Sequence, residues 1–202
     1  DRDESHREAY REDLEYVLER AGRIRGVIVT HGHEDHVGAL SYLLRQIKAP
    51  VYATRLTQGL IEVKLREARV SGVDLQTVEP GDMVEIGPFD IEFFHVSHSI
   101  PGCVGLGIHT PVGLIVHSGD YKFDHSPVDG CCTDFAKLAE LGGQGVTLLL
   151  SDSTNSETSG YTPSEQTIAE MLSRVFGNAK GRVIVATFAS NISRIQQVVD
   201  MA

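Results

Sequence analysis

The sequence predicts a layered α/β sandwich, and three observations lead to that fold class. Short apolar runs typical of buried strands alternate with segments of helical periodicity over residues 10–70. Residues 75–118 carry several strand-like runs separated by Gly and Pro turns, which indicates a meander of antiparallel hairpins. Helix and strand patterns then alternate again up to Ala202. Helices that flank a hairpin-rich sheet are typical of a layered α/β domain.

The first elements are expected in the order helix, strand, helix, strand, helix. Apolar residues at helical spacing predict a helix over 10–21, and Gly22 follows it as a stop. The run IRGVIVT at 24–30 predicts a short buried strand. The next expected elements are a helix over 38–47, a strand over 51–54 and a helix over 55–70.

The second half is expected to open with four strands of the meander and to continue with alternating helices and strands. A capping box predicts one helix start, with Thr162 as the N-cap, Pro163 at the first helical position and Glu165 reaching back. The predicted strands are 82–86, 89–96, 104–110, 113–118, 146–151 and 182–187. Further helices are predicted at about 133–141 and at 190–202.

Composition limits the class of protein. A chain of 202 residues with 41% hydrophobic residues can bury a core, and its formal charge of −10 argues against a broad basic surface for nucleic acid. A bound cation could reverse that charge locally. Three cysteines without a CxxC pair predict reduced thiols. No apolar run approaches the roughly 18–20 residues of a membrane span and no secretory leader pattern opens the sequence, so a cytoplasmic protein without membrane contact is expected.

Four potential metal ligands, His31, His33, Asp35 and His36, lie within six residues of the stretch THGHEDHVGAL. His31 and His33 are two residues apart, so extended backbone points both rings to the same side. Asp35 and His36 are expected on the turn into the next helix. Zinc and manganese accept imidazole nitrogen and carboxylate oxygen, and four ligands are too many for one ion that must keep a water, so two ions are predicted. The alternative is a polar surface loop.

Further ligands are expected where later strands end. His98 lies where a strand breaks into a Ser-Ile-Pro-Gly turn, and Asp120 follows the strand GLIVHSG. Loops beyond strand ends commonly carry the chemistry of α/β folds. A core histidine is the alternative for His98, and a turn-forming acid is the alternative for Asp120. The histidines expected inside strands, and therefore as partly buried structural residues, are His95, His109 and His117.

Taken together, these motifs resemble the metallo-β-lactamase fold, whose signature is the HxHxDH loop seen here at 31–36. The stretches THGHEDHVGAL, HSIPG, GDYKFD, LLLSDSTN, GYTPSE and VIVATFASNISRIQQ are similar to the ribonuclease J branch of the β-CASP nucleases. This resemblance runs from about residue 24 to residue 200. It implies a partial αββα sandwich of metallo-β-lactamase type over 1–180 and the start of a β-CASP α/β unit over 181–202.

The resemblance also implies a site for two divalent metal ions, with zinc expected and manganese or magnesium as alternatives. The implied ligands are His31, His33 and His98 for the first ion and Asp35 and His36 for the second, with Asp120 bridging both. Asp152 matches the motif A acid of the β-CASP nucleases, which orients a histidine further along the chain. Without the resemblance, Asp152 would be interpreted as a helix or turn cap. The implied catalytic acids are therefore Asp35, Asp120 and Asp152.

The function implied by the resemblance is hydrolysis of RNA phosphodiester bonds in RNA processing and decay, by 5′-to-3′ exonuclease and endonuclease activity with preference for a 5′-monophosphate end. A hydroxide held between two metal ions would attack phosphorus in line. Family members carry additional strands, a complete β-CASP domain and a late histidine ligand, so this sequence is expected to be part of a longer polypeptide. The resemblance also implies that the full-length protein is a homo-oligomer. The alternatives are a small-molecule metallohydrolase of the same fold and a non-catalytic metal-binding assembly module.

Overall fold

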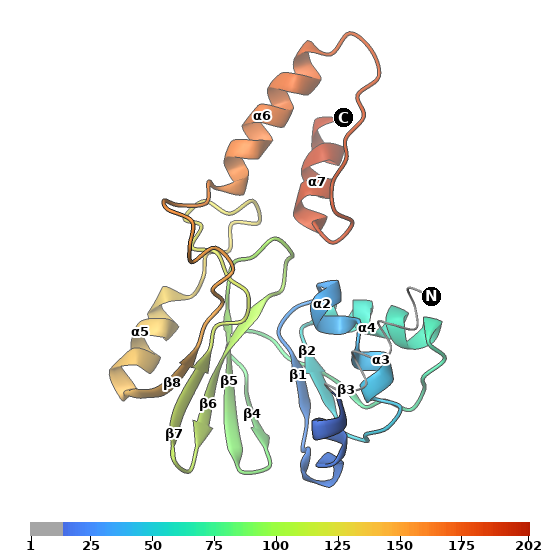
Figure 1. The fold of residues 1–202 in the computed structure, drawn as a ribbon. Coiled ribbons are helices and arrows are strands. Elements are labelled where there is room, and N and C mark those ends of the chain that lie inside the picture. The colour runs from blue at the N-terminus through green and yellow to red at the C-terminus, as the bar shows by residue number, and fades with distance from the viewer. Residues whose placement is uncertain (1–13) are drawn as a thin grey trace. The chain divides into compact units, whose positions relative to one another are not determined.

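The computed structural model describes residues 14–202, and the chain divides into two compact units, Asp1–Val78 and Glu79–Ala202 (Figure 1). Each unit is built around one sheet, of three strands in the first unit and five in the second. Helices accompany both sheets, which confirms the predicted mixture of α and β structure. Within the described residues, no helix combines the length and the apolar character that spanning a membrane would require.

The first unit has a wholly parallel sheet in the order β1–β2–β3. Its strands are β1 (Val27–Val29), β2 (Val51–Ala53) and β3 (Leu75–Thr77). Parallel neighbours need crossover connections, and helices supply them. The helices are η1 (Ala21–Arg23) before β1, α2 (Glu34–Val37) and α3 (Leu40–Leu43) between β1 and β2, and α4 (Arg55–Glu67) between β2 and β3.

A single apolar cluster forms the core of this unit. Val51 of β2 packs there together with Ile61 of α4, and both have no exposed surface. The apolar residues of α4 recur at i and i+4, so they lie on one helix face. Other members of the cluster are Val29, Val37, Leu40, Leu44, Ile47, Ala53 and Leu65. This core fixes the end of β1, from which the histidine-rich loop leaves.

The second unit contains a five-stranded sheet in the order β4–β5–β6–β7–β8. The first four strands are antiparallel, as predicted, and β8 pairs with β7 in parallel. The strands are β4 (Met83–Ile86), β5 (Phe89–His95), β6 (Val104–Thr110), β7 (Gly113–His117) and β8 (Val146–Leu150). The helices are α5 (Phe135–Gln144), which connects β7 to β8, and then α6 (Glu165–Asn178) and α7 (Ile192–Met201).

Two glycines of β6 make room for large side chains on one face of this sheet. Phe94 of β5 is paired with Gly105, and Leu141 of α5 lies over Gly107. Both large side chains are buried almost completely. The alternation of glycine with apolar residues in VGLGIHT is therefore a packing feature, and α5 can lie close to the sheet because β6 lacks side chains there.

Several predicted elements differ from the structure in extent or pairing. Residues 14–18 are helical, whereas the beginning of the helix predicted over 10–21 lies outside the described residues. The helix predicted over 38–47 is reduced to the short α3. The stretch from residue 75 was expected to open the antiparallel meander, but β3 pairs in parallel with β2 in the other sheet. The crossover through α4 makes that pairing available, since parallel strands need a long connection.

Two predictions for the C-terminal third were wrong. Helix α6 begins at Glu165, and its N-cap is Ser164 rather than Thr162, because the Ser164 hydroxyl accepts a hydrogen bond from the backbone N–H of Gln166 at 3.2 Å. Within the part of the chain that the structure describes, residues 182–187 form no strand, and Ile184 is 87% exposed. An apolar run rich in β-branched residues is not stable as a strand without a neighbouring strand.

Replacing Gly105 by alanine is expected to destabilise the protein by about 1–3 kcal/mol, because the new Cβ would overlap the buried ring of Phe94. Gly142 of α5 is the matched control, since a Cβ there meets no atom within 4 Å. Gly142→Ala is expected to stabilise by about 0.5–1 kcal/mol through helix propensity. Urea unfolding of the two variants measures both effects, and equal stabilities would contradict the packing account.

Candidate metal centre

His31 emerges at the carboxyl end of β1 and is held in place by its neighbour. Thr30 and His31 follow the strand, both are buried, and His31 has 0% exposed surface. The hydroxyl of Thr30 lies 3.1 Å from Nδ1 of His31. Metal-binding histidines usually have one ring nitrogen held by such a partner, which orients the other nitrogen toward the ion. The contact therefore favours Nε2 of His31 as the coordinating atom.

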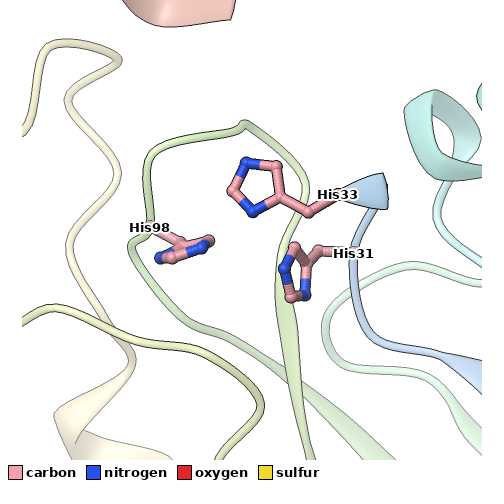
Figure 2. Close-up of side chains that lie close together, drawn as sticks. All are labelled: His31, His33 and His98. Atoms are coloured by element: carbon pink, nitrogen blue, oxygen red, sulfur yellow. The ribbon is translucent and has the colours of Figure 1, made fainter. Parts of the chain in front are cut away.

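One turn of helix brings two more imidazoles beside His31. His33 is the N-cap of α2, and its carbonyl accepts the backbone N–H groups of His36 and Val37, both at 3.0 Å. The ring centroid of His31 lies 4.8 Å from that of His33 and 4.0 Å from that of His36. Figure 2 shows His31 and His33 on the loop that joins β1 to α2. Three imidazoles thus converge at the end of β1.

Asp35 lies at the edge of this histidine group. Its Oδ2 is 3.6 Å from Nε2 of His36, and its side chain is 77% exposed. Asp35 and His36 were expected on the turn that leads into a helix. In the structure they lie within the short helix α2. Glu34 forms an ion pair with Lys64 of α4 at 2.8 Å, which ties α2 to the core helix. The first unit therefore gathers His31, His33 and His36, and Asp35 lies beside His36.

The second unit brings His98 and Asp120 together. Nε2 of His98 lies 3.9 Å from Oδ2 of Asp120, and both side chains are half-buried. His98 is on the loop after β5, where Figure 2 labels it, and Asp120 follows β7. Strands β5 and β7 are both antiparallel to β6, so they run in the same direction and their carboxyl ends lie at one edge of the sheet. Sheet topology therefore explains the proximity of residues that are 22 apart in sequence.

The turn that carries Asp120 is shaped by Gly119 and His117. Gly119 has a φ of 61°, in the left-handed region that glycine adopts without strain. Its N–H donates to Nδ1 of His117 at 3.0 Å. His117 was predicted to be a structural strand histidine, and its role in holding this turn was not predicted. Gly119, directly before Asp120, was the feature of the sequence that could have indicated a tight turn here.

Asp152 is held next to the Asp120 turn by the ends of β7 and β8. Ser118 donates its backbone N–H to the carbonyl of Leu150 at 2.9 Å, and its hydroxyl accepts the backbone N–H of Asp152 at 3.0 Å. The Asp152 carboxylate accepts hydrogen bonds from the N–H and hydroxyl of Thr154, at 2.8 and 2.6 Å. Burial raises the pKa of Asp152, but these bonds, the backbone of Tyr121 and the charge of His98 outweigh burial and lower the pKa.

The remaining strand histidines have structural contacts. His95 contacts the carbonyl of Cys131 through Nε2 at 3.0 Å, and His109 contacts the carboxylate of Glu92 at 2.6 Å. Both are half-buried, as predicted. Burial raises the pKa of Glu92, but its contacts with His109 and Lys137 outweigh that effect and lower it. These pairs belong to the packing of the second unit.

The donor groups of the two units fit divalent transition-metal ions. Imidazole nitrogens predominate in the first unit, and the second unit adds an imidazole together with a carboxylate, which are the ligand types of zinc and manganese. Neutral imidazole is the form that binds a metal ion, so metal binding by these residues would require unprotonated rings.

Comparison with known proteins gives the family of the chain. Residues 5–130, more than half of the chain, match the family described as the Beta-lactamase superfamily domain. The chain belongs to the β-lactamase superfamily. Its metallo-β-lactamase fold, predicted from the HxHxDH loop, is thereby confirmed. A crystal structure of a protein of unknown function from Enterococcus faecalis V583 has the same fold, with a TM-score of 0.62 and 18% identity, over 87% of this chain and 44% of that one.

Ribonuclease J sequences are similar to this superfamily member over nearly its whole length. Ribonuclease J of Synechocystis sp. is 47% identical over 94% of this chain and 30% of its own length. Ribonuclease J of Thermus thermophilus is 46% identical over 92% of this chain and 34% of its own length. The chain thus spans about a third of the length of these relatives. The predicted resemblance to ribonuclease J is confirmed, and the domain boundary between residues 180 and 181 stays a prediction.

Thr154→Val is expected to raise the pKa of Asp152 toward the usual value of about 3.9, because the hydroxyl hydrogen bond is lost. A lowered pKa in the folded state contributes stability above the unfolded pKa, and this contribution disappears as the pH falls through the folded pKa. The variant should therefore be less stable than the parent at pH 7, and the difference should shrink as the pH falls through the folded-state pKa of Asp152. Carboxyl-carbon NMR titration and urea unfolding measure the two quantities. Thr154→Ser, which keeps the hydroxyl, should behave like the parent, and an unchanged pKa in Thr154→Val would contradict the assignment.

Proposed function

We propose that this chain contributes the metal-binding part of a ribonuclease that hydrolyses RNA phosphodiester bonds. The observation that carries the proposal is the convergence of His31, His33 and His36 in a chain that is 47% identical to a ribonuclease J. A second donor pair, His98 and Asp120, lies at one sheet edge. Hydrolytic metal centres use this combination of imidazoles and a carboxylate.

Two divalent ions, with zinc expected, complete this centre in the proposal. The first ion would be held by His31, His33 and His98, the second by Asp35 and His36, and Asp120 would bridge them. When bound, such ions lower the pKa of water toward neutrality and screen the charge that builds up on phosphate oxygens. The contact from Thr30 keeps His31 oriented, and the Gly119 turn keeps Asp120 at the edge of the sheet.

Asp152 has a separate role in the proposal. Its carboxylate is ionised at neutral pH and is held by the N–H and the hydroxyl of Thr154. An ionised carboxylate can accept a hydrogen bond from an imidazole and orient that ring to donate a proton to the leaving oxygen. Asp152 would therefore assist the departure of the product, while Asp35 and Asp120 serve the metal ions.

The substrate in this proposal is RNA with a 5′-monophosphate end, cleaved by 5′-to-3′ exonuclease and endonuclease steps. The names of the relatives support the choice of RNA. The complete protein is proposed to act in the cytoplasm as a homo-oligomer and to include a β-CASP domain that begins at residue 181.

Metal analysis tests the centre directly. The complete protein is expected to bind two divalent ions per chain, measured by mass spectrometry of metals after dialysis against zinc. His33→Ala removes a proposed ligand and should weaken binding by at least about 100-fold, more than the loss of an outer-shell partner does. His125→Ala is the control, because His125 is exposed and outside the proposed ligand set. Equal metal content in the two variants would exclude the His33 assignment.

Activity distinguishes the proposed function from the alternatives. Labelled 5′-monophosphate RNA, the same RNA with a 5′-hydroxyl end, a thioester and a β-lactam are each incubated with the complete protein. The first substrate should be hydrolysed fastest, and Asp120→Asn should reduce kcat by about 10²–10⁴-fold. Faster lactam or thioester hydrolysis would replace the proposal by a small-molecule hydrolase. Two bound ions without hydrolysis of any substrate would indicate an assembly module.

A further inference from the structure

The backbone of Lys122 connects the two loops that carry His98 and Asp120. Lys122 follows Asp120 by two residues, and its N–H donates to the carbonyl of Ser97 at 2.7 Å, directly before His98. The carbonyl of Lys122 accepts the hydroxyl of Thr133 at 3.5 Å, and that hydroxyl accepts the N–H of Ser97 at 3.0 Å. These contacts fix the spacing between the two loops.

The side chain of Lys122 extends in another direction, to the start of α6. Its Nζ donates to the carbonyl of Pro163 at 2.6 Å and lies 3.7 Å from Oδ2 of Asp124 and 3.9 Å from Oε1 of Glu165. The Lys122 side chain is only 19% exposed, and that of Asp124 is 3% exposed. A largely buried ammonium group with three acceptors is held firmly, because losing them would leave an uncompensated charge.

The two acids around this ammonium meet at the N-terminal turn of α6, where Glu165 is the first helical residue and Asp124 reaches it from the loop after β7. Asp124 accepts the N–H of Glu165 at 3.2 Å through Oδ2 and the N–H of Ser126 at 2.9 Å through Oδ1. A carboxylate is favourable at this end of a helix. Glu165 in turn forms an ion pair with Arg194 of α7. Contacts therefore run from α7 through Glu165 and Lys122 to the loops of the candidate ligands.

We propose that Lys122 is a positioning residue, which couples the helix pair α6–α7 to the geometry of His98 and Asp120. This inference rests on the metal centre proposed above. The Asp120 turn contains Gly119 in the left-handed conformation, and a glycine turn can adopt other conformations easily. The Lys122 ammonium restricts that freedom by tying the end of the turn to α6. A displacement of α6 would therefore move Lys122, which follows Asp120 by two residues. It would also move Ser97, which Lys122 holds, and with it the adjacent His98.

Cobalt binding by the complete protein tests this coupling. Visible absorption of bound Co²⁺ reports the geometry of its ligands, and thermal unfolding of the same samples reports stability separately. Lys122→Met keeps the apolar stem and removes the ammonium. The variant is expected to bind Co²⁺ about 10–100-fold more weakly, with a shifted absorption band, as for the loss of other groups that orient metal ligands. Lys122→Arg should recover most of the affinity.

Lys137→Met is the matched control. The Lys137 side chain is 25% exposed and pairs with Glu92 at 3.1 Å and with Glu140 at 2.8 Å, joining α5 to β5. It should lose stability comparable to that of Lys122→Met but keep the Co²⁺ affinity and spectrum of the parent within twofold. If Lys122→Met fails to fold, Glu165→Gln weakens the same link from the α6 side and should shift the spectrum in the same direction.

The outcomes separate the inference from the metal centre on which it rests. If Lys122→Met binds Co²⁺ with wild-type affinity and an unchanged spectrum, the positioning role is overturned and the metal centre stands. The same result in Glu165→Gln has this meaning where that variant replaces Lys122→Met. An equal loss of affinity in Lys137→Met would also overturn it, because general stability would then explain the effect. Absence of Co²⁺ binding by the wild-type protein would overturn the metal centre and the coupling together.

Discussion

The parallel pairing of β7 and β8 is the constraint on which the acidic part of the candidate site depends. His117 at the end of β7 is paired with Leu150 at the end of β8, so both strands leave the sheet at the same edge. Asp120 and Asp152 follow within three residues of those ends, and Ser118 links the two exits. Ser118 thus places Asp152 next to the Asp120 turn, although the two acids are 32 residues apart in sequence. β5 runs in the same direction and delivers His98 to this edge.

The histidine group of the first unit depends on local spacing instead. His31 and His33 leave β1 in extended backbone, and a single helical turn returns His36 to His31. For this reason the sequence alone predicted the group. Asp35 lies beside His36 and is mostly exposed, and its role as a metal ligand stays a prediction.

Other parts of the structure depend on contacts with residues far away in the sequence, which a local sequence pattern does not reveal. Thr162, Pro163 and Glu165 match a capping box, yet the helix starts later because the carbonyl of Pro163 is bound by Lys122 and the first helical N–H is bound by Asp124. Both partners lie about 40 residues earlier in the chain. The run 182–187 has strand propensity without a neighbouring strand among the described residues, and it remains irregular. By contrast, the meander was predictable because its hairpins are closed by local turns.

The formal charge of −10 opposes the binding of RNA, the substrate proposed above, because both carry negative charge. The acids assigned to the proposed centre are Asp35, Asp120 and Asp152. Carboxylates bind metal ions in their ionised form, so in the metal-bound state these acids would contribute three negative charges. Two divalent ions would add four positive charges, and neutral imidazoles add none. The local balance would then be one positive charge, so phosphate would be attracted at the centre although it is repelled by the chain as a whole. The hydrogen bond that holds the Asp120 turn matters for the same reason, because this carboxylate would repel the phosphate if it moved away from the proposed ions.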